Sequence, residues 1–234
     1  MSEAPALETF QTRDALSDAA AGALADALRA ALAHDGRASL IVTGGSSPGP
    51  VYDRLADADL GWDRVTVTLS DDRFVPETSD LSNARLVRER LLQHEASAAR
   101  FVPLVHGGAT PDADAAAAEP EVEALAPFAA VLLGVGEDGH IASLFPGAPG
   151  VAEALDPVGP RGVVGVPEAR LAPFVPRISL TARLLFRTSL VVVLITGEAK
   201  RALVERVRAE PAYDPPVAAV LRQSLAPVRV LWAP

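Results

Sequence analysis

Short runs rich in valine, isoleucine and leucine alternate along the chain with segments whose apolar residues recur every three or four positions. The first pattern is typical of buried strands and the second of amphipathic helices. The apolar runs are SLIVTGG from Ser39, VTVTLSDD from Val65, AAVLLGVG from Ala129, SLVVVLITG from Ser189 and VRVLWA from Val228. The helix-like segments include DALSDAAAGALADALRAALA, SNARLVRERLL and EAKRALVERVRA. This alternation predicts an α/β fold with a mostly parallel sheet covered by helices on both faces.

We expect residues 1–234 to form a single domain, because no boundary or internal repeat divides the chain. The stretch from Pro146 to Pro176 is the one long irregular region; it is rich in proline and glycine and contains a candidate short strand, VVGV. It is the place where a small lobe is expected. The roughly 38 residues before the first apolar run are expected to form one alanine-rich helix.

Composition narrows the classes of partner. Hydrophobic residues make up 49% of the chain and charged residues 22%, which is ordinary for a globular protein. The net charge of −9 disfavours a general nucleic-acid or membrane binder, so any anion must meet a local positive cluster. Cysteine is absent, the acidic N-terminal segment lacks the pattern of a signal peptide, and the longest strongly apolar run, LVVVLIT, is too short to span a bilayer. We therefore expect a cytoplasmic protein.

The first strand is followed by TGGSSPGP, at the sheet edge where α/β proteins bind their ligands. Glycine lets backbone N–H groups approach a ligand closely, and proline is tolerated where a helix starts. With the helix dipole, Gly44, Gly45 and Ser46 suit an anion such as phosphate. A plain strand-to-helix turn with a hydroxyl cap fits this stretch equally well.

The second strand ends in SDDRF, which contains Asp71, Asp72 and Arg73. Acids beside an arginine can hold one another and bind sugar hydroxyls, but a surface ion pair in a loop has the same sequence. For Asp72 alone, the surface ion pair is the favoured interpretation. Ten residues later, Ser82 or Asn83 is expected to cap the next helix.

Lys200 is the only lysine among the 21 lysine and arginine residues. It follows a buried run, within TGEAK, in the first turn of a predicted helix. A cation is disfavoured there, because the N-terminus of a helix is already its positive end. A bound anion would relieve this conflict, although a single lysine could also occupy the position by chance.

The stretch LLGVGEDGHIASLFPG, residues 132–147, contains the dinucleotide pattern G-x-G-x-x-G. That motif needs a helix continuing from its third glycine, but Pro146 follows Gly139 by seven residues. It also needs an acid at the end of a second strand, whereas Asp156 lies in VAEALDPVG, which has no strand pattern. We therefore expect no nucleotide cofactor at this loop.

The same loop places His140 two residues after Asp138, on a glycine-rich turn at the end of a strand. An imidazole accepts and returns protons near neutral pH. Cysteine and a G-x-S-x-G elbow are both absent, so general acid–base chemistry is favoured over a covalent nucleophile. His140 also lacks nearby histidine partners, and no metal site is expected.

Several of these motifs occur together in one known family. TGGSSP, SDDRFVP with LSNARL, LLGVGEDGHIASLFPG, PRISL and TGEAK resemble, in order and spacing, those of the 6-phosphogluconolactonase family, from about Ser39 to Lys200. The resemblance implies an α/β fold of the glucosamine-6-phosphate isomerase type. It also implies hydrolysis of 6-phospho-glucono-1,5-lactone in the pentose phosphate pathway, without metal or nucleotide cofactor; no obligatory protein partner is inferred.

The resemblance also assigns roles to residues. It implies that His140 is the general base that activates water, with Asp138 either orienting the imidazole or contacting a substrate hydroxyl. Backbone N–H groups of the glycine-rich turn are candidates to stabilise the oxyanion. The expected substrate-binding residues, around phosphate and sugar, are Gly44, Gly45, Ser46, Asp71, Arg73, Asn83, Arg177 and Lys200.

The chain departs from the family pattern in three places. It has Asp71-Asp72-Arg73 where Asp-Glu-Arg is usual, Ser179 where threonine is usual, and a tail that lacks the acidic residue often found there. Two alternatives stay open. A glucosamine-6-phosphate deaminase shares the Asp-Gly-His signature but usually has an aromatic residue at the position of Arg73, and a non-catalytic sugar-phosphate sensor usually carries a helix-turn-helix ahead of this fold.

Overall fold

The structure is a computed structural model that describes residues 5–234; residues 1–4, the start of the acidic segment considered above, lie outside the described residues. Its helices and strands follow one another as β1 (Leu7–Thr9), α1 (Arg13–Asp35), β2 (Ala38–Val42), α2 (Gly49–Ala56), η1 (Trp62–Arg64), β3 (Val65–Leu69), β4 (Asp71–Arg73), α3 (Asn83–Arg90), η2 (His94–Ala98), β5 (Arg100–Val102), α4 (Pro111–Glu123), β6 (Ala130–Gly134), α5 (Val151–Ala154), β7 (Val163–Val166), β8 (Arg177–Leu180), α6 (Ala182–Leu185), β9 (Val191–Thr196), α7 (Glu198–Ala209), α8 (Pro216–Arg222) and β10 (Val228–Ala233).

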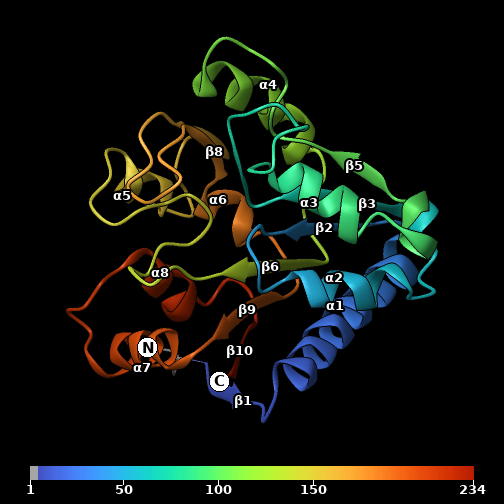
Figure 1. Ribbon diagram of the computed structural model, residues 1–234, viewed down its shortest axis with the longest axis horizontal. Coiled ribbons are helices and arrows are strands. Elements are labelled where there is room, and N and C mark those ends of the chain that lie inside the picture. The colour runs from blue at the N-terminus through green and yellow to red at the C-terminus, as the bar shows by residue number, and fades with distance from the viewer. Residues whose placement is uncertain (1–4) are drawn as a thin grey trace.

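Seven strands form a parallel central sheet in the order β1-β10-β9-β6-β2-β3-β5 (Figure 1). The five apolar runs of the sequence are β2, β3, β6, β9 and β10, so each predicted strand is confirmed. Strands β2, β6 and β9 are buried along nearly their whole length. This burial on both faces explains why their sequences are continuously apolar.

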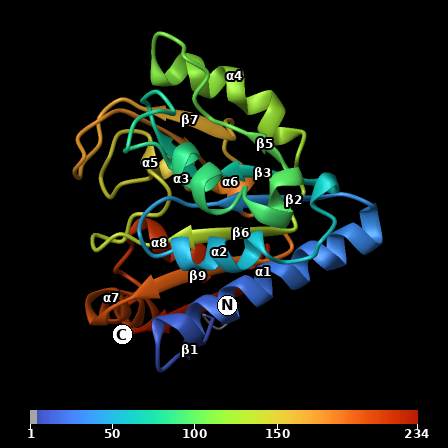
Figure 2. The ribbon, with the colours of Figure 1, turned by 45° about the vertical axis from the view of Figure 1, so that its right-hand side comes forward.

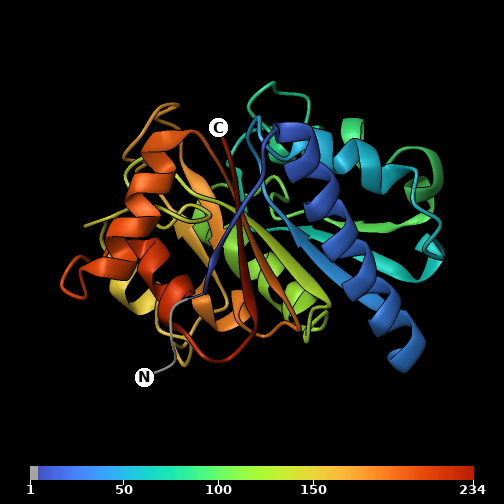
Figure 3. The same ribbon diagram turned by 90° about the horizontal axis from the view of Figure 1, so that it is seen from below.

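Helices cover both faces of this sheet, as predicted. Figure 3 shows α1 and α2 on one side and α7 with α8 on the other. Helix α1 begins where the Thr12 side chain accepts a hydrogen bond from the Ala15 N–H, and it ends at Gly36, whose φ of 71° is left-handed. None of the helices within residues 5–234 is long and apolar enough to cross a membrane.

The N-terminal segment differs from the expectation of a single helix, because β1 precedes α1 and pairs with β10. Strands β1 and β5 form the two edges of the sheet and have only three residues each. Three residues are too few to produce a periodic pattern, so neither strand could be read from the sequence.

A second, antiparallel sheet with the order β4-β8-β7 lies beside the first. The candidate strand VVGV is confirmed as β7, within the proline- and glycine-rich region, whereas β4 and β8 carry charged and polar residues that concealed them. Figure 2 shows α4 beside β7. The two backbones are in close contact, since a Cβ at Gly165 would lie 2.5 Å from the Asp112 carboxylate and 2.6 Å from its backbone nitrogen.

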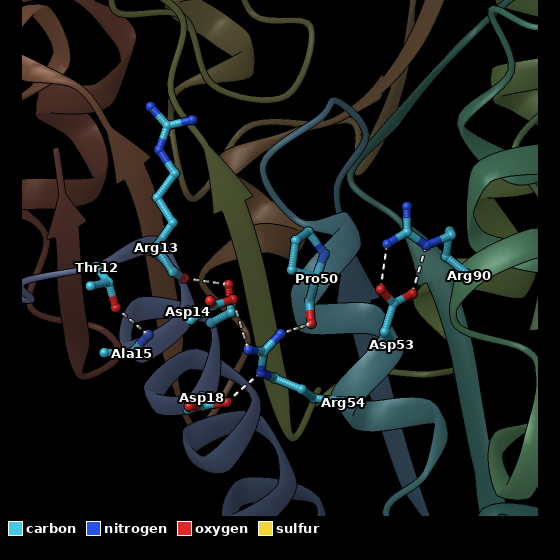
Figure 4. A network of polar contacts seen from close by, with 10 residues as sticks. Thr12, Arg13, Asp14, Ala15, Asp18, Pro50, Asp53, Arg54 and Arg90 are labelled. Carbon is cyan, nitrogen blue, oxygen red and sulfur yellow. Dashed lines mark hydrogen bonds and ion pairs between the residues drawn. The ribbon is translucent and has the colours of Figure 1, made fainter.

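Ion pairs hold α2 between α1 and α3 (Figure 4). Arg54 of α2 pairs with Asp14 and Asp18 of α1 and donates to the Pro50 carbonyl at 2.8 Å. Asp53, also on α2, accepts two hydrogen bonds from Arg90 of α3. These partly exposed contacts join α2, which follows the glycine-rich loop after β2, to a helix on either side.

Candidate active site

A cavity of about 260 Å³ lies where the carboxyl ends of β2, β6 and β9 meet β4 and β8. It contains all the predicted substrate-binding residues and His140; Asp138 lies behind the imidazole. The lining residues are Thr43, Gly44, Gly45, Ser46, Ser47, Pro48, Asp71, Arg73, Asn83, Gly134, Val135, Gly136, His140, Ala142, Arg177, Leu194 and Lys200. Residues spread over more than 150 positions of the chain therefore share one pocket.

The loop after β2 presents free backbone donors to this pocket. Within the described residues, the N–H groups of Gly44, Gly45 and Ser46 have no hydrogen-bond partner. The hydroxyl cap considered as the alternative is absent, because Pro48 occupies the N-cap of α2 and no side chain bonds there. A Cβ at Gly44 would lie 1.9 Å from the Asn83 Oδ1 atom, so only glycine fits at this position. Free N–H groups in the loop that leads into a helix N-terminus favour the anion-binding interpretation.

Two arginines face each other across strands β4 and β8. Arg73 and Arg177 are register partners, and neither has an ion pair within the described residues. Each Nε atom is buried without a hydrogen-bond partner. Like charges opposite one another in a sheet destabilise it, and an unpaired buried donor costs about 1–3 kcal/mol. A bound dianion would compensate both charges.

Arg177 is only 4% exposed and lies 5.3 Å above the centre of the Phe145 ring. Burial, followed by the charge of Arg73, lowers the pKa of Arg177. Lys200 lies in the first turn of α7, as predicted, and its side chain makes no hydrogen bond or ion pair with any other described residue. The net-acidic chain thus concentrates three cations, unpaired with any carboxylate, around one cavity.

His140 and Asp138 form a hydrogen-bonded pair. The Nδ1 atom of His140 lies 2.6 Å from Asp138 Oδ1, and the His140 N–H donates to the same oxygen at 3.1 Å. Burial by itself would raise the pKa of Asp138, but the hydrogen bonds and charge of His140 outweigh it and leave that pKa below its usual value. The pair leaves Nε2 as the free imidazole nitrogen. The Phe145 ring packs against the imidazole with a centroid separation of 4.8 Å.

The glycine-rich turn packs closely against the imidazole, and its backbone N–H groups already donate hydrogen bonds within the turn. A Cβ at Gly136 would lie 2.1 Å from the His140 ring, and Gly139 has a φ of 85°. The Gly136 N–H donates to the His140 carbonyl and the Gly139 N–H to the Gly136 carbonyl. The expectation that these N–H groups stabilise the oxyanion is therefore wrong for Gly136, Gly139 and His140 in this conformation. No helix follows Gly139 directly, in agreement with the rejection of a dinucleotide loop.

Sequence reasoning missed two serines that donate to Asp71. The Ser143 hydroxyl lies 2.6 Å from Asp71 Oδ2, and the Ser70 hydroxyl donates to Oδ1 at 3.1 Å. Ser179, noted above only as a departure from the family pattern, accepts from the Ser143 N–H at 3.1 Å. Asp71 is 4% exposed, so its carboxyl group is buried at the pocket and is not a surface group. Serine is too common along the chain for Ser70 and Ser143 to have been identified from sequence alone.

The favoured interpretation of Asp72 as a surface ion pair is wrong. Its side chain is 1% exposed and points away from the pocket, into the start of α3. Burial raises the pKa of Asp72 to about 6, against the opposing effect of its backbone hydrogen bonds. Ser82 is the N-cap of α3, one of the two caps expected.

Metal-ligating side chains do not gather at this site. Across residues 5–234, no three histidine, cysteine, aspartate or glutamate side chains lie close enough together to hold a metal ion. His140 itself has one acidic partner, Asp138.

A sequence model of the glucosamine-6-phosphate isomerases/6-phosphogluconolactonase family matches residues 11–232. The chain belongs to this family. A 6-phosphogluconolactonase from Caulobacter vibrioides is 51% identical over 227 residues, which cover 97% of each chain. The family assignment therefore rests on nearly the whole length of the protein.

Solved structures of the family have the same fold. A crystal structure of a 6-phosphogluconolactonase from Shewanella baltica superimposes with a TM-score of 0.89 at 32% identity, over 98% of each chain. A monomeric glucosamine-6-phosphate deaminase superimposes with a TM-score of 0.78 at 21% identity, over 97% of this chain and 96% of that one, and at this identity the likeness concerns the fold alone. Two chemistries thus occur on this fold, and residues of the pocket must distinguish them.

Proposed function

We propose that the protein hydrolyses 6-phospho-D-glucono-1,5-lactone to 6-phospho-D-gluconate, the lactonase step of the pentose phosphate pathway. The family and the name of its 51% identical relative support the reaction. The observation that carries the proposal is the pocket itself, which combines three cations that make no ion pair with the described residues and a histidine–aspartate pair. We also propose that it acts as one cytoplasmic domain with a sugar phosphate as its partner, and without cofactor, metal, membrane, nucleic acid or obligatory protein partner.

The cationic cluster is the proposed phosphate site. Arg73, Arg177 and Lys200 supply positive charge, and the loop from Gly44 to Ser46 supplies N–H donors. Charge-assisted hydrogen bonds to such an anion are roughly twice as strong as neutral ones. Asp71 and Asn83, on the same pocket wall, are the proposed partners of the sugar hydroxyls.

Lactone hydrolysis needs one group that takes a proton and later returns it. Nε2 of His140 accepts a proton from water while the water oxygen adds to the C1 carbonyl of the lactone. The tetrahedral intermediate then collapses, the bond between C1 and the ring oxygen breaks, and the imidazolium returns its proton to that oxygen. One imidazole acts in both half-steps. The reaction adds one water molecule to the lactone and involves no oxidation or reduction.

Asp138 is the proposed orienting group for His140. Its 2.6 Å contact with Nδ1 selects the tautomer in which Nε2 is the free base. Its ionised carboxylate also stabilises the imidazolium that forms when water attacks. Between the two roles considered for Asp138, the geometry supports orientation over contact with a hydroxyl.

Side-by-side incubation with two substrates tests the proposal. Purified protein is given freshly made 6-phosphogluconolactone in one series and glucosamine 6-phosphate in the other. Acid release from the lactone is followed above its spontaneous hydrolysis, and ammonia release from the amine is assayed. Lactone turnover without ammonia supports the lactonase, ammonia release indicates the deaminase, and binding without turnover of either indicates a sensor.

A further inference from the structure

Asp72 sits in sequence between two pocket residues but does not line the pocket itself. Its carboxylate accepts three backbone hydrogen bonds: from Asn83 at 2.6 Å and Arg73 at 2.8 Å on Oδ1, and from Ala84 at 3.0 Å on Oδ2. Two of these donors belong to residues of the proposed substrate site. A side chain that is 1% exposed thus binds the backbone of two residues whose side chains reach the substrate.

Further hydrogen bonds join the same two segments. The Asn83 amide donates to the Asp71 carbonyl at 2.8 Å, and an Nη atom of Arg73 donates to the Leu81 carbonyl at 2.8 Å. Both bonds run between β4 and the start of α3. Asp72 lies at the centre of this connection, because it alone among these side chains accepts from both segments.

Asn83 also contacts the loop after β2. The Cα of Gly44 packs directly on the Asn83 side chain, so closely that a Cβ would lie 1.9 Å from Oδ1. A shift at the start of α3 therefore moves Asn83 against the loop whose N–H groups face the pocket.

Capping of α3 accounts for the bonds that Asp72 accepts from Asn83 and Ala84, but not for the bond from Arg73 on β4. Ser82 already caps α3, since its hydroxyl accepts from the Arg85 N–H at 3.2 Å. We propose that Asp72 is a positioning residue whose carboxylate holds Asn83 and Arg73 in the arrangement that captures the phosphorylated substrate. The identity of that ligand rests on the proposed function.

Asp114 provides a matched control. It is also 1% exposed and also accepts three backbone hydrogen bonds, from His106, Gly107 and Gly108 at 2.6, 3.0 and 2.7 Å. It lies outside the pocket. Asp114→Asn therefore removes the same kind of interaction as Asp72→Asn without disturbing a substrate-binding residue.

The experiment compares both variants with wild type in three measurements: kcat and KM for the 6-phospho lactone, Kd for 6-phosphogluconate by calorimetry, and Tm. An asparagine keeps the shape but places an NH2 donor against a backbone N–H. Asp72→Asn should raise KM and Kd about 10-fold or more, with a smaller change in kcat. This increase corresponds to losing one charge-assisted hydrogen bond between the displaced site residues and the substrate. Asp114→Asn should lower Tm but leave KM and Kd unchanged.

A second pair of variants, with smaller changes, keeps the test valid if Asp72→Asn does not fold. Ser82→Ala removes the N-cap of α3 and a 3.4 Å contact with Asp72, and Thr110→Ala removes the corresponding N-cap of α4, which accepts from the Ala113 N–H at 3.2 Å. Ser82→Ala should raise KM and Kd, and Thr110→Ala should change neither.

Equal effects of the paired variants on KM and Kd, or no effect of either, would overturn the positioning role. Failure of the proposed function looks different, because it appears in the wild type. Wild type that binds 6-phosphogluconate without hydrolysing the lactone is not a lactonase, and the Kd comparison still decides the role of Asp72. Wild type that binds neither compound refutes both proposals.

Discussion

Replacement of Lys200 by alanine tests the phosphate site. Lys200 makes no hydrogen bond or ion pair with the described residues, so its removal leaves no protein acceptor unsatisfied. The loss is then that of one charge-assisted hydrogen bond to substrate, about 1.5–3 kcal/mol, or roughly 10- to 150-fold in kcat/KM. Because the phosphate does not react, the change should appear mainly in KM.

The structure also predicts the sign of the stability change. Lys200 is a cation in the first turn of α7, where charge and helix dipole repel each other by about 0.3–1 kcal/mol. Lys200→Ala should therefore unfold at the same temperature as wild type or slightly higher. A binding defect together with unchanged or raised Tm separates a role in substrate capture from a role in folding.

The assay compares the 6-phospho lactone with unphosphorylated glucono-1,5-lactone, after subtraction of spontaneous hydrolysis. The unphosphorylated lactone cannot respond to the missing charge, so only turnover of the phosphorylated substrate should fall. Equal losses with both substrates would refute the reasoning and place Lys200 in the chemistry or in folding.

Three further results are expected. Asp138→Asn should lower kcat by about 10²-fold or more, because an amide NH2 group placed against Nδ1 favours the tautomer in which Nε2 carries the proton; a wild-type kcat would separate Asp138 from His140. Gly136→Ala should lower kcat by about 10²-fold or more, since its Cβ must displace the His140 imidazole, the proposed base, whereas Gly22→Ala, with open space around its Cβ, should not change the kinetics. Dialysis against a chelator should leave turnover unchanged, and activity lost and then restored by one ion would contradict the metal-free mechanism.

Much of the central sheet could be predicted because burial on both faces leaves a direct sequence signal. Strands such as Val191–Thr196 are continuously apolar, and the glycines and charged groups that follow such strands mark the binding edge. In the second sheet only β7, the apolar VVGV, left such a signal, and β4 and β8 left none. Asp71–Arg73 resembles a polar loop in sequence. Its charged side chains line the pocket or bond the start of α3, and they do not pack in a hydrophobic core.

The pairing of Arg73 with Arg177 could not be predicted either. It depends on the antiparallel register of β4 and β8. These two segments lie about 100 residues apart and are too short to show a recognisable periodicity. Asp72 and its neighbour Asp71 illustrate the same limit, since only the backbone conformation decides which carboxylate faces the pocket and which faces α3. Charge and motif identified the candidate residues, and tertiary structure determined what each contacts.

The most direct test of the mechanism is the rate at which His140→Ala hydrolyses 6-phosphogluconolactone, corrected for spontaneous opening and compared with wild type. The account predicts a fall in kcat of about 10²- to 10⁴-fold, the usual contribution of a general base, with folded protein and retained binding of 6-phosphogluconate. A variant that folds, binds the product and still turns over the lactone at the wild-type rate would contradict the assignment of His140 as the base.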